Sequence, residues 1–126
     1  LGDVTSCMRS LLERLIFMNL SYEKDKRTTF TGRISAGFLY TMGIRQDEVE
    51  AFGYPRLFQL HMNFFQLFNG AAEYLISTDT YQFDDYAKYN ASKYDERHKA
   101  EVRATQFPID CERAFEMGAR LASMKG

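Results

Sequence analysis

The run Arg33-Ile-Ser-Ala-Gly-Phe-Leu-Tyr-Thr-Met-Gly43 is the feature that most constrains the fold of this chain. It is apolar and small through its middle, shows no clean alternation, and is bounded by glycines. Such a run is typical of a β-strand buried on both faces of a parallel sheet. Residues 35–37 carry little side chain, so helices could approach the sheet closely there. Ligands of open α/β sheets bind beyond the carboxyl ends of the strands, where this run releases hydroxyls and a glycine.

A helix and a polar segment precede this strand. Apolar residues recur at three-and-four spacing from Val4 to Ile16, which predicts an amphipathic helix with Asp3 or Thr5 as its N-cap. We expect the polar segment from Asn19 to Thr31 to be a solvated connector.

A second helix is expected after the strand. Asp47 and Glu50 have capping-box spacing and predict a short helical turn. Pro55 then suits the first turn of a helix from Arg56 to about Asn69, with Gly70 as its C-terminal glycine. Its apolar residues cover more than one face. We therefore expect the helix Leu57 to Phe68 to be buried on several sides and to form the contact of a homo-oligomer.

A second strand is predicted from Ala71 to Thr80, which gives a parallel strand–helix–strand unit. A charged helix or a partly ordered excursion is expected from Lys93 to Thr105, and Phe107-Pro108 should separate it from a last helix. The expected inner face of that last helix comprises Cys111, Ala114, Phe115, Gly118, Leu121 and Ala122. Two strands make too small a sheet. We expect either a larger doubly wound domain, which we prefer, or a strand from a partner chain.

Composition narrows the class of protein. The chain has 126 residues and a net charge of −1, which indicates one domain and gives no sign of a nucleic-acid partner. No apolar run is long enough to span a membrane. Two distant cysteines without metal-ligand spacing favour a reduced, cytoplasmic protein. The chain begins at Leu1 without methionine and runs almost directly into a helix, so we expect a preceding strand.

The isolated cysteine, histidine, aromatic and aspartate side chains are expected to have mainly structural roles. Cys7 and Cys111 lie on predicted apolar stripes and are expected to be inert core residues, although a reactive thiol at Cys7 remains an alternative. His61 should be packed in its helix and His98 solvated. Three aromatic residues could stack on a ligand or belong to the core: Tyr54, Tyr81 and Phe83. The pair Asp84-Asp85 is expected to form a turn.

Several motifs in order resemble one family. They are Leu1-Gly-Asp-Val-Thr-Ser6 with the helix to Arg14, the run Thr78 to Tyr86, and Phe107-Pro-x-Asp-Cys-x-x-Ala-Phe-x-x-Gly118. Together they resemble the C-terminal part of flavodoxin-like NAD(P)H-dependent FMN reductases and iron–sulfur flavoproteins. The resemblance implies a flavodoxin-like doubly wound parallel sheet, of which residues 1–126 supply the C-terminal portion.

The resemblance also implies a cofactor and its contacts. FMN would lie at the carboxyl edge of the sheet, with NAD(P)H as electron donor. Gly2, Asp3, Val4 and Thr5 match the loop after the family's third strand. The loop after its fourth strand corresponds to Thr41, Met42 and Gly43. The family's phosphate-binding loop and its iron–sulfur cysteines are expected only in preceding sequence.

The resemblance thus predicts an FMN-dependent oxidoreductase that passes electrons to a quinone, a flavin or a redox protein. No nucleophile–base pair or metal-ligand set stands out in the sequence, which suits an enzyme whose chemistry belongs to its cofactor. The alternative is a non-catalytic interaction or assembly module, or an incomplete flavoprotein fragment without cofactor. The acceptor and the choice between NADH and NADPH stay open.

Overall fold

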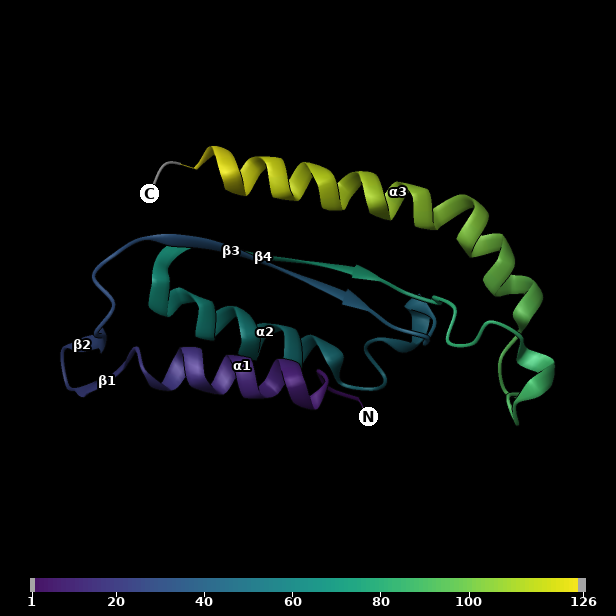
Figure 1. The fold of residues 1–126 in the computed structure, drawn as a ribbon, viewed down its shortest axis with the longest axis horizontal. Coiled ribbons are helices and arrows are strands. Elements are labelled where there is room, and N and C mark those ends of the chain that lie inside the picture. Colours follow the sequence, from purple (N-terminus) through teal and green to yellow (C-terminus); the bar gives the residue numbers. More distant parts are fainter. Residues whose placement is uncertain (1, 125–126) are drawn as a thin grey trace.

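The computed structural model describes residues 2–124, which form a mixed α/β fold. The elements in order are α1 (Ser6–Phe17), β1 (Leu20–Glu23), β2 (Lys26–Thr28), β3 (Ile34–Thr41), α2 (Tyr54–Phe65), β4 (Asn69–Ser77) and α3 (Glu96–Ser123), with short 3-10 turns at Gln46–Glu48, Gln66–Phe68 and Tyr86–Lys88. Helix α3 lies on one side of the β3–β4 pair, and α1 and α2 lie on the other (Figure 1).

Strands β3 and β4 pair in parallel through the crossover helix α2, as the sequence predicts. The register runs from Ala36 opposite Ala72 to Thr41 opposite Ser77. A second, antiparallel pair joins β1 to β2 in the segment expected to be a connector, so that expectation is wrong. The described residues contain no full doubly wound sheet, because each of β3 and β4 has one strand neighbour.

The core lies between the sheet and α2. Phe38 and Tyr40 stack on each other with ring centroids 4.4 Å apart, and Tyr40 also meets Phe58 at 4.4 Å. Alternate residues of β3 face α3 instead, and Leu39 there is 53% exposed. The prediction that β3 is buried on both faces is therefore wrong for Leu39.

Helix α2 uses its apolar residues inside the chain. Phe58 and Met62 are buried, as are Leu67 and Phe68 just beyond the helix. The helix ends earlier than predicted, and Asn69, in the left-handed conformation with φ of 60°, takes the stopping role expected of Gly70. Leu60 is the large apolar side chain of this helix that stays exposed, at 46%.

Helix α3 is continuous through Pro108, although a break was predicted there. A helix-interior proline removes one backbone hydrogen bond and bends the helix. The Pro108 turn is exposed and α3 curves along its length, so water can satisfy the freed carbonyl (Figure 1). The buried face of α3 runs through Asp110 and Met117 rather than Cys111 and Phe115, and Phe115 is 78% exposed. The predicted inner face of the last helix was thus right for Ala114 and Leu121, which are partly buried, and wrong for its exposed members, Cys111, Phe115, Gly118 and Ala122.

Glycines set the closest approaches in the sheet. A Cβ on Gly37 would lie 2.8 Å from the Leu121 side chain and 3.0 Å from that of Met117, so α3 approaches the sheet at the small residues as predicted. A Cβ on Gly70 would lie 2.1 Å from the backbone oxygen of Ile34. Backbone cannot move aside as a side-chain end can, so Gly70 is required for β3 and β4 to pair.

We expect Gly70→Ala to lower the free energy of unfolding by about 3 kcal/mol or more, because the added methyl overlaps the β3 backbone. Chemical denaturation measures this change. Gly118→Ala is the matched control: nothing lies within 4 Å of its added Cβ, and alanine favours helix, so stability should hold or rise. Equal stability of the two variants would contradict this account of the pairing.

Candidate functional site

The carboxyl ends of β3 and β4 and the start of α1 lie at the same end of the molecule (Figure 1). Val4 from the start of α1 packs on the same core cluster as Met42, Ile44 and Tyr54. A Cβ on Gly2 would lie 3.9 Å from the Tyr54 hydroxyl oxygen. The structure therefore brings the two segments predicted to hold a cofactor, residues 2–5 and 41–43, to one edge.

The first segment forms the N-terminal cap of α1. The Thr5 side chain accepts a hydrogen bond from the Met8 amide at 3.3 Å, which identifies Thr5 rather than Asp3 as the N-cap. Asp3 accepts a hydrogen bond from the Val4 amide and forms an ion pair with Arg9. Gly2 has a φ of 79°, in the left-handed region that favours glycine.

The second segment is fastened to the loop after β4. The Met42 amide donates to the Ser77 carbonyl at 3.0 Å, and the Thr80 amide donates to the Met42 carbonyl at 3.1 Å. The Asp79 amide donates to the Ile44 carbonyl at 2.7 Å. These bonds continue the strand pairing beyond the sheet and hold the loop after β3 in one conformation.

Both segments present backbone donors without partners. The amides of Gly43 and Ile44 have no hydrogen-bond acceptor among residues 2–124, and neither have those of Ser6 and Cys7 in the first turn of α1. First-turn amides of a helix are unpaired by geometry, and they favour electronegative atoms. The edge thus offers two sets of N–H groups to acceptor atoms of a ligand.

A charged cluster lies directly behind the Gly43 loop. Lys99 is only 2% exposed, and its ammonium donates to Asp79 Oδ1 at 2.5 Å, to the Gly43 carbonyl at 2.8 Å and to the Thr80 carbonyl at 3.3 Å. His98 Nδ1 lies 2.5 Å from the other carboxylate oxygen of Asp79. The cluster ties the N-terminal part of α3 to both strand-end loops.

The ionisation of Asp79 reflects this setting. Burial alone would raise its pKa, but hydrogen bonds from Lys99 and His98, together with their charges, lower the pKa below its usual value. Asp79 also has a φ of 55°, a left-handed conformation that aspartate and asparagine tolerate better than most residues. Asp79 therefore stays ionised and anchors its two neighbours.

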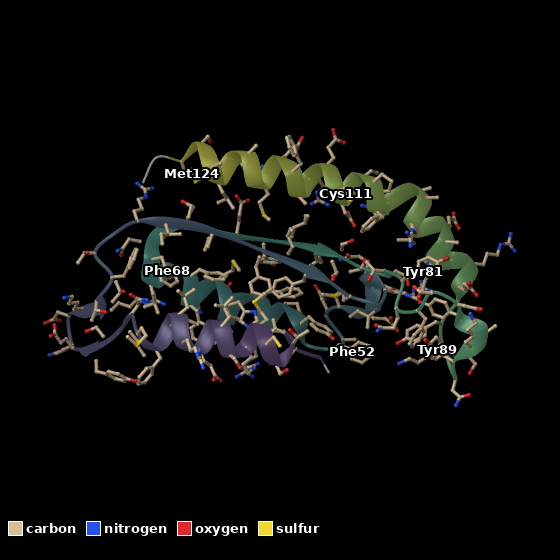
Figure 2. All side chains as sticks on the ribbon, in the orientation of Figure 1. Phe52, Phe68, Tyr81, Tyr89, Cys111 and Met124 are labelled. Atoms are coloured by element: carbon tan, nitrogen blue, oxygen red, sulfur yellow. The ribbon has the colours of Figure 1, made fainter. Side chains whose placement is uncertain are left out.

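A cavity of about 260 Å³ opens beside the cluster. It is bounded by the loop after β3 and by the start of α3, and its lining includes Gly43, Ile44, Arg45, Glu48, Phe52, Lys93, Tyr94 and Lys99. Phe52 is 64% exposed. Figure 2 places Phe52, Tyr81 and Tyr89 toward this end of the molecule and Phe68 and Met124 at the opposite end. The edge thus combines backbone donors with accessible aromatic rings.

The three aromatic residues whose role the sequence did not decide fall into two groups. Tyr54 packs against the core, with its ring centroid 6.1 Å from that of Phe58. Tyr81 and Phe83 instead surround Tyr86, at centroid distances of 5.7 and 5.3 Å. They belong to a tyrosine-rich cluster beyond β4, and Tyr81 also lies beneath the Arg103 guanidinium.

The remaining candidate side chains have structural settings. His61 is buried as predicted, and its Nδ1 lies 2.6 Å from the Tyr40 hydroxyl. Burial, and then the charge of Arg9, lower the pKa of His61, whereas burial raises that of Tyr40. Both cysteines are exposed, which contradicts the prediction that they are core residues. No group of three or more potential metal ligands occurs among residues 2–124.

Sequence reasoning missed the cluster of Asp79, His98 and Lys99. His98 was expected to be merely solvated, but it contacts Asp79. Nineteen or twenty residues separate Asp79 from its two partners, and no local spacing signals that they meet. A lysine in a charged helical segment ordinarily faces water.

Replacing Asp79 by asparagine should cost about 3 kcal/mol of stability at neutral pH, because it leaves Lys99 buried without its counter-ion. The pKa of Asp79 is lower in the folded protein than its unfolded value of about 3.9. The ionised carboxylate therefore stabilises the fold fully above the unfolded pKa, and this stabilisation is lost as the pH falls through the lower folded-state pKa. The difference between wild type and Asp79→Asn should therefore shrink in acid. Denaturation at several pH values measures it.

Asp47→Asn is the control for that experiment. It removes an exposed carboxylate paired with Arg45, and surface pairs contribute less than about 1 kcal/mol. A pH-independent penalty for Asp79→Asn would contradict the assigned ion pair.

Comparison with known proteins does not identify this chain: no protein family, no curated protein and no solved structure matches it. No helix among residues 2–124 has the length and apolar character needed to cross a bilayer.

Proposed function

We propose that this chain is the C-terminal part of a flavodoxin-like, FMN-dependent oxidoreductase. The observation that carries the proposal is the pair of unpaired backbone donor sets, at Gly43-Ile44 and in the first turn of α1, at the carboxyl edge of a parallel strand–helix–strand unit. Among residues 2–124, β3 and β4 each have one strand neighbour, so the outer edge of each is where further strands of a doubly wound sheet would pair.

The residues at this edge fit a flavin ring. The isoalloxazine system carries carbonyl oxygens and ring nitrogens that accept hydrogen bonds, and backbone N–H groups supply the matching donors. A Cβ on Gly43 would lie 3.8 Å from the Thr80 carbonyl oxygen and 4.0 Å from Gln82 Oε1, at ordinary contact distance, so the glycine leaves a methyl-sized space beside these donors. Flat ligands need such close access to backbone. The backbone N–H donors of the loop thus match the carbonyl oxygens and nitrogens along one edge of the ring.

Bound FMN would supply hydride chemistry with NAD(P)H as donor and a quinone, a flavin or a redox protein as acceptor. The chain's own part is to bind and orient the ring. The Gly43 and Ile44 amides would donate to it, and the hydrogen bonds from Asp79 and Thr80 keep this loop in place. Phe52 and Tyr94 line the adjoining cavity and would limit the access of water.

The first experiment is a titration with FMN and with lumiflavin, the ring system without its ribityl phosphate, followed by amide NMR. Lumiflavin tests the ring contacts without needing a phosphate loop. At ligand concentrations up to about 1 mM, which detect even weak binding, we expect the Gly43 and Ile44 signals to shift. Unchanged signals with both ligands would reject the flavin site and favour a non-catalytic module.

A variant makes the test specific. Gly43→Val should weaken lumiflavin binding by about tenfold or more, equivalent to about 1.4 kcal/mol, because the side chain projects into the space beside the donors. The backbone conformation does not require glycine there, so thermal stability should change little. Gly118→Ala, on the open face of α3, is the control. Wild-type affinity in Gly43→Val would place the ligand elsewhere.

The oligomer proposed for this enzyme would use the outer face of α2. Leu60 is exposed and Phe64 is half-buried, whereas Phe58, Met62 and Phe65 of the same helix belong to the core. If this face is the contact, Phe64→Asp should convert the oligomer to monomer on a sizing column with light scattering. Gln59→Asp, a polar change on the same helix, is the control. An unchanged mass for Phe64→Asp would contradict a contact through this helix.

A further inference from the structure

The peptide group between Gly43 and Ile44 has two different ends. Its oxygen accepts a hydrogen bond from the Lys99 ammonium at 2.8 Å. Its N–H, that of Ile44, has no acceptor among residues 2–124. The amide is one resonance unit, so a cation bound at the oxygen draws electron density from the nitrogen and makes the N–H a stronger donor.

We propose that Lys99 is a positioning residue for the flavin: it holds and polarises the Gly43–Ile44 peptide that donates to the ring. This inference rests on the proposed function. Lys99 acts through the loop, and its ammonium is directed at the Gly43 carbonyl and Asp79.

The loop is fixed at several points that converge on Lys99. Ile44 accepts from the Asp79 amide, and the Asp79 carboxylate pairs with Lys99. Thr80, which donates to Met42, also accepts from Lys99 at 3.3 Å. One buried ammonium thus joins the ends of β3 and β4 to α3. Preorganised donors bind more tightly because their ordering cost is met on folding.

Packing alone does not explain why the Lys99 side chain is buried. Its side chain is 2% exposed, and its three hydrogen bonds all go to the strand-end loops. The Tyr94 ring lies 5.1 Å from the ammonium and shields it further. Two of its three acceptors are backbone carbonyls of the loops, so the ammonium fixes loop backbone in addition to pairing with Asp79.

Lys93 provides a matched control. It lines the same cavity, but it is exposed, and its ammonium lies over the Tyr94 ring at 4.8 Å rather than on the Gly43 carbonyl. Lys93→Met therefore removes the same charge from the same cavity without touching the loop. The double variant described next keeps the net charge, because it removes both members of an ion pair, so Lys93→Met shows separately what the loss of a cavity lysine does to ligand binding.

The main variant is the double change Asp79→Asn with Lys99→Met. Lys99→Met alone leaves Asp79 as an unpaired buried charge and endangers the fold, whereas removing both partners avoids that penalty. Ser77→Ala controls for weaker attachment of α3, because it removes the 2.8 Å bond to Asp110 without changing the Gly43 loop. Thermal denaturation of each variant reports whether the fold is kept.

Two readouts test the proposal. Without ligand, the amide nitrogen of Ile44 should change its NMR chemical shift in the double variant, and it should stay unchanged in Lys93→Met and Ser77→Ala. With lumiflavin, affinity should fall by about tenfold or more in the double variant, as expected for loss of a charge-assisted interaction. Ser77→Ala should bind like wild type, and Lys93→Met should lose less affinity than the double variant.

The outcomes separate the two proposals. A folded double variant with wild-type affinity for lumiflavin would overturn the role of Lys99 and leave the flavin site intact. An equal affinity loss in Lys93→Met would assign the effect to the loss of any lysine from the cavity rather than to the Lys99 bond at Gly43, and would also overturn it. Failure of wild-type protein to bind lumiflavin or FMN would instead reject the proposed function, together with the inference that depends on it.

Discussion

The structure depends on the parallel pairing of β3 with β4 between helices on both faces. Parallel strands need a crossover, and α2 supplies it while covering the aromatic face formed by Phe38 and Tyr40. Gly70 allows the β4 backbone to approach Ile34 more closely than any side chain would permit. This pairing sets both strand ends at one edge, and every candidate binding residue follows from that placement.

The buried ion pair of Lys99 and Asp79 is the second constraint. Burying a charge is costly unless it is paired and fully hydrogen-bonded, and Lys99 meets both conditions. Its acceptors come from the loops after β3 and β4. The hydrogen bonds that offset the cost of removing the ammonium from water therefore lie where these two loops meet α3. The same contacts join α3 to the carboxyl edge of the sheet.

The edge has the character of a site that binds rather than one that reacts. Its free groups are backbone amides and aromatic rings, while the buried charges of Asp79 and Lys99 are paired with each other. Such an arrangement suits a ligand that brings its own reactivity, as a flavin does.

The sequence by itself determined the elements that follow from local periodicity and chain stiffness. The strand after Gly32, the crossover helix opening at Pro55 and the parallel return strand were all predicted, because buried runs and amphipathic stripes are local signals. The segments 2–5 and 41–43 were correctly expected at a helix start and a strand end.

Only the tertiary structure decided the rest. The β1–β2 hairpin forms in a polar segment without a clear alternating pattern, and α3 continues through Pro108 because the freed carbonyl can reach water. The buried face of α3 passes through Asp110 and Met117, since the sheet contacts choose which stripe is inward. Asp79 and Lys99 meet across twenty residues of chain, and their pairing depends on where α3 packs rather than on any local pattern.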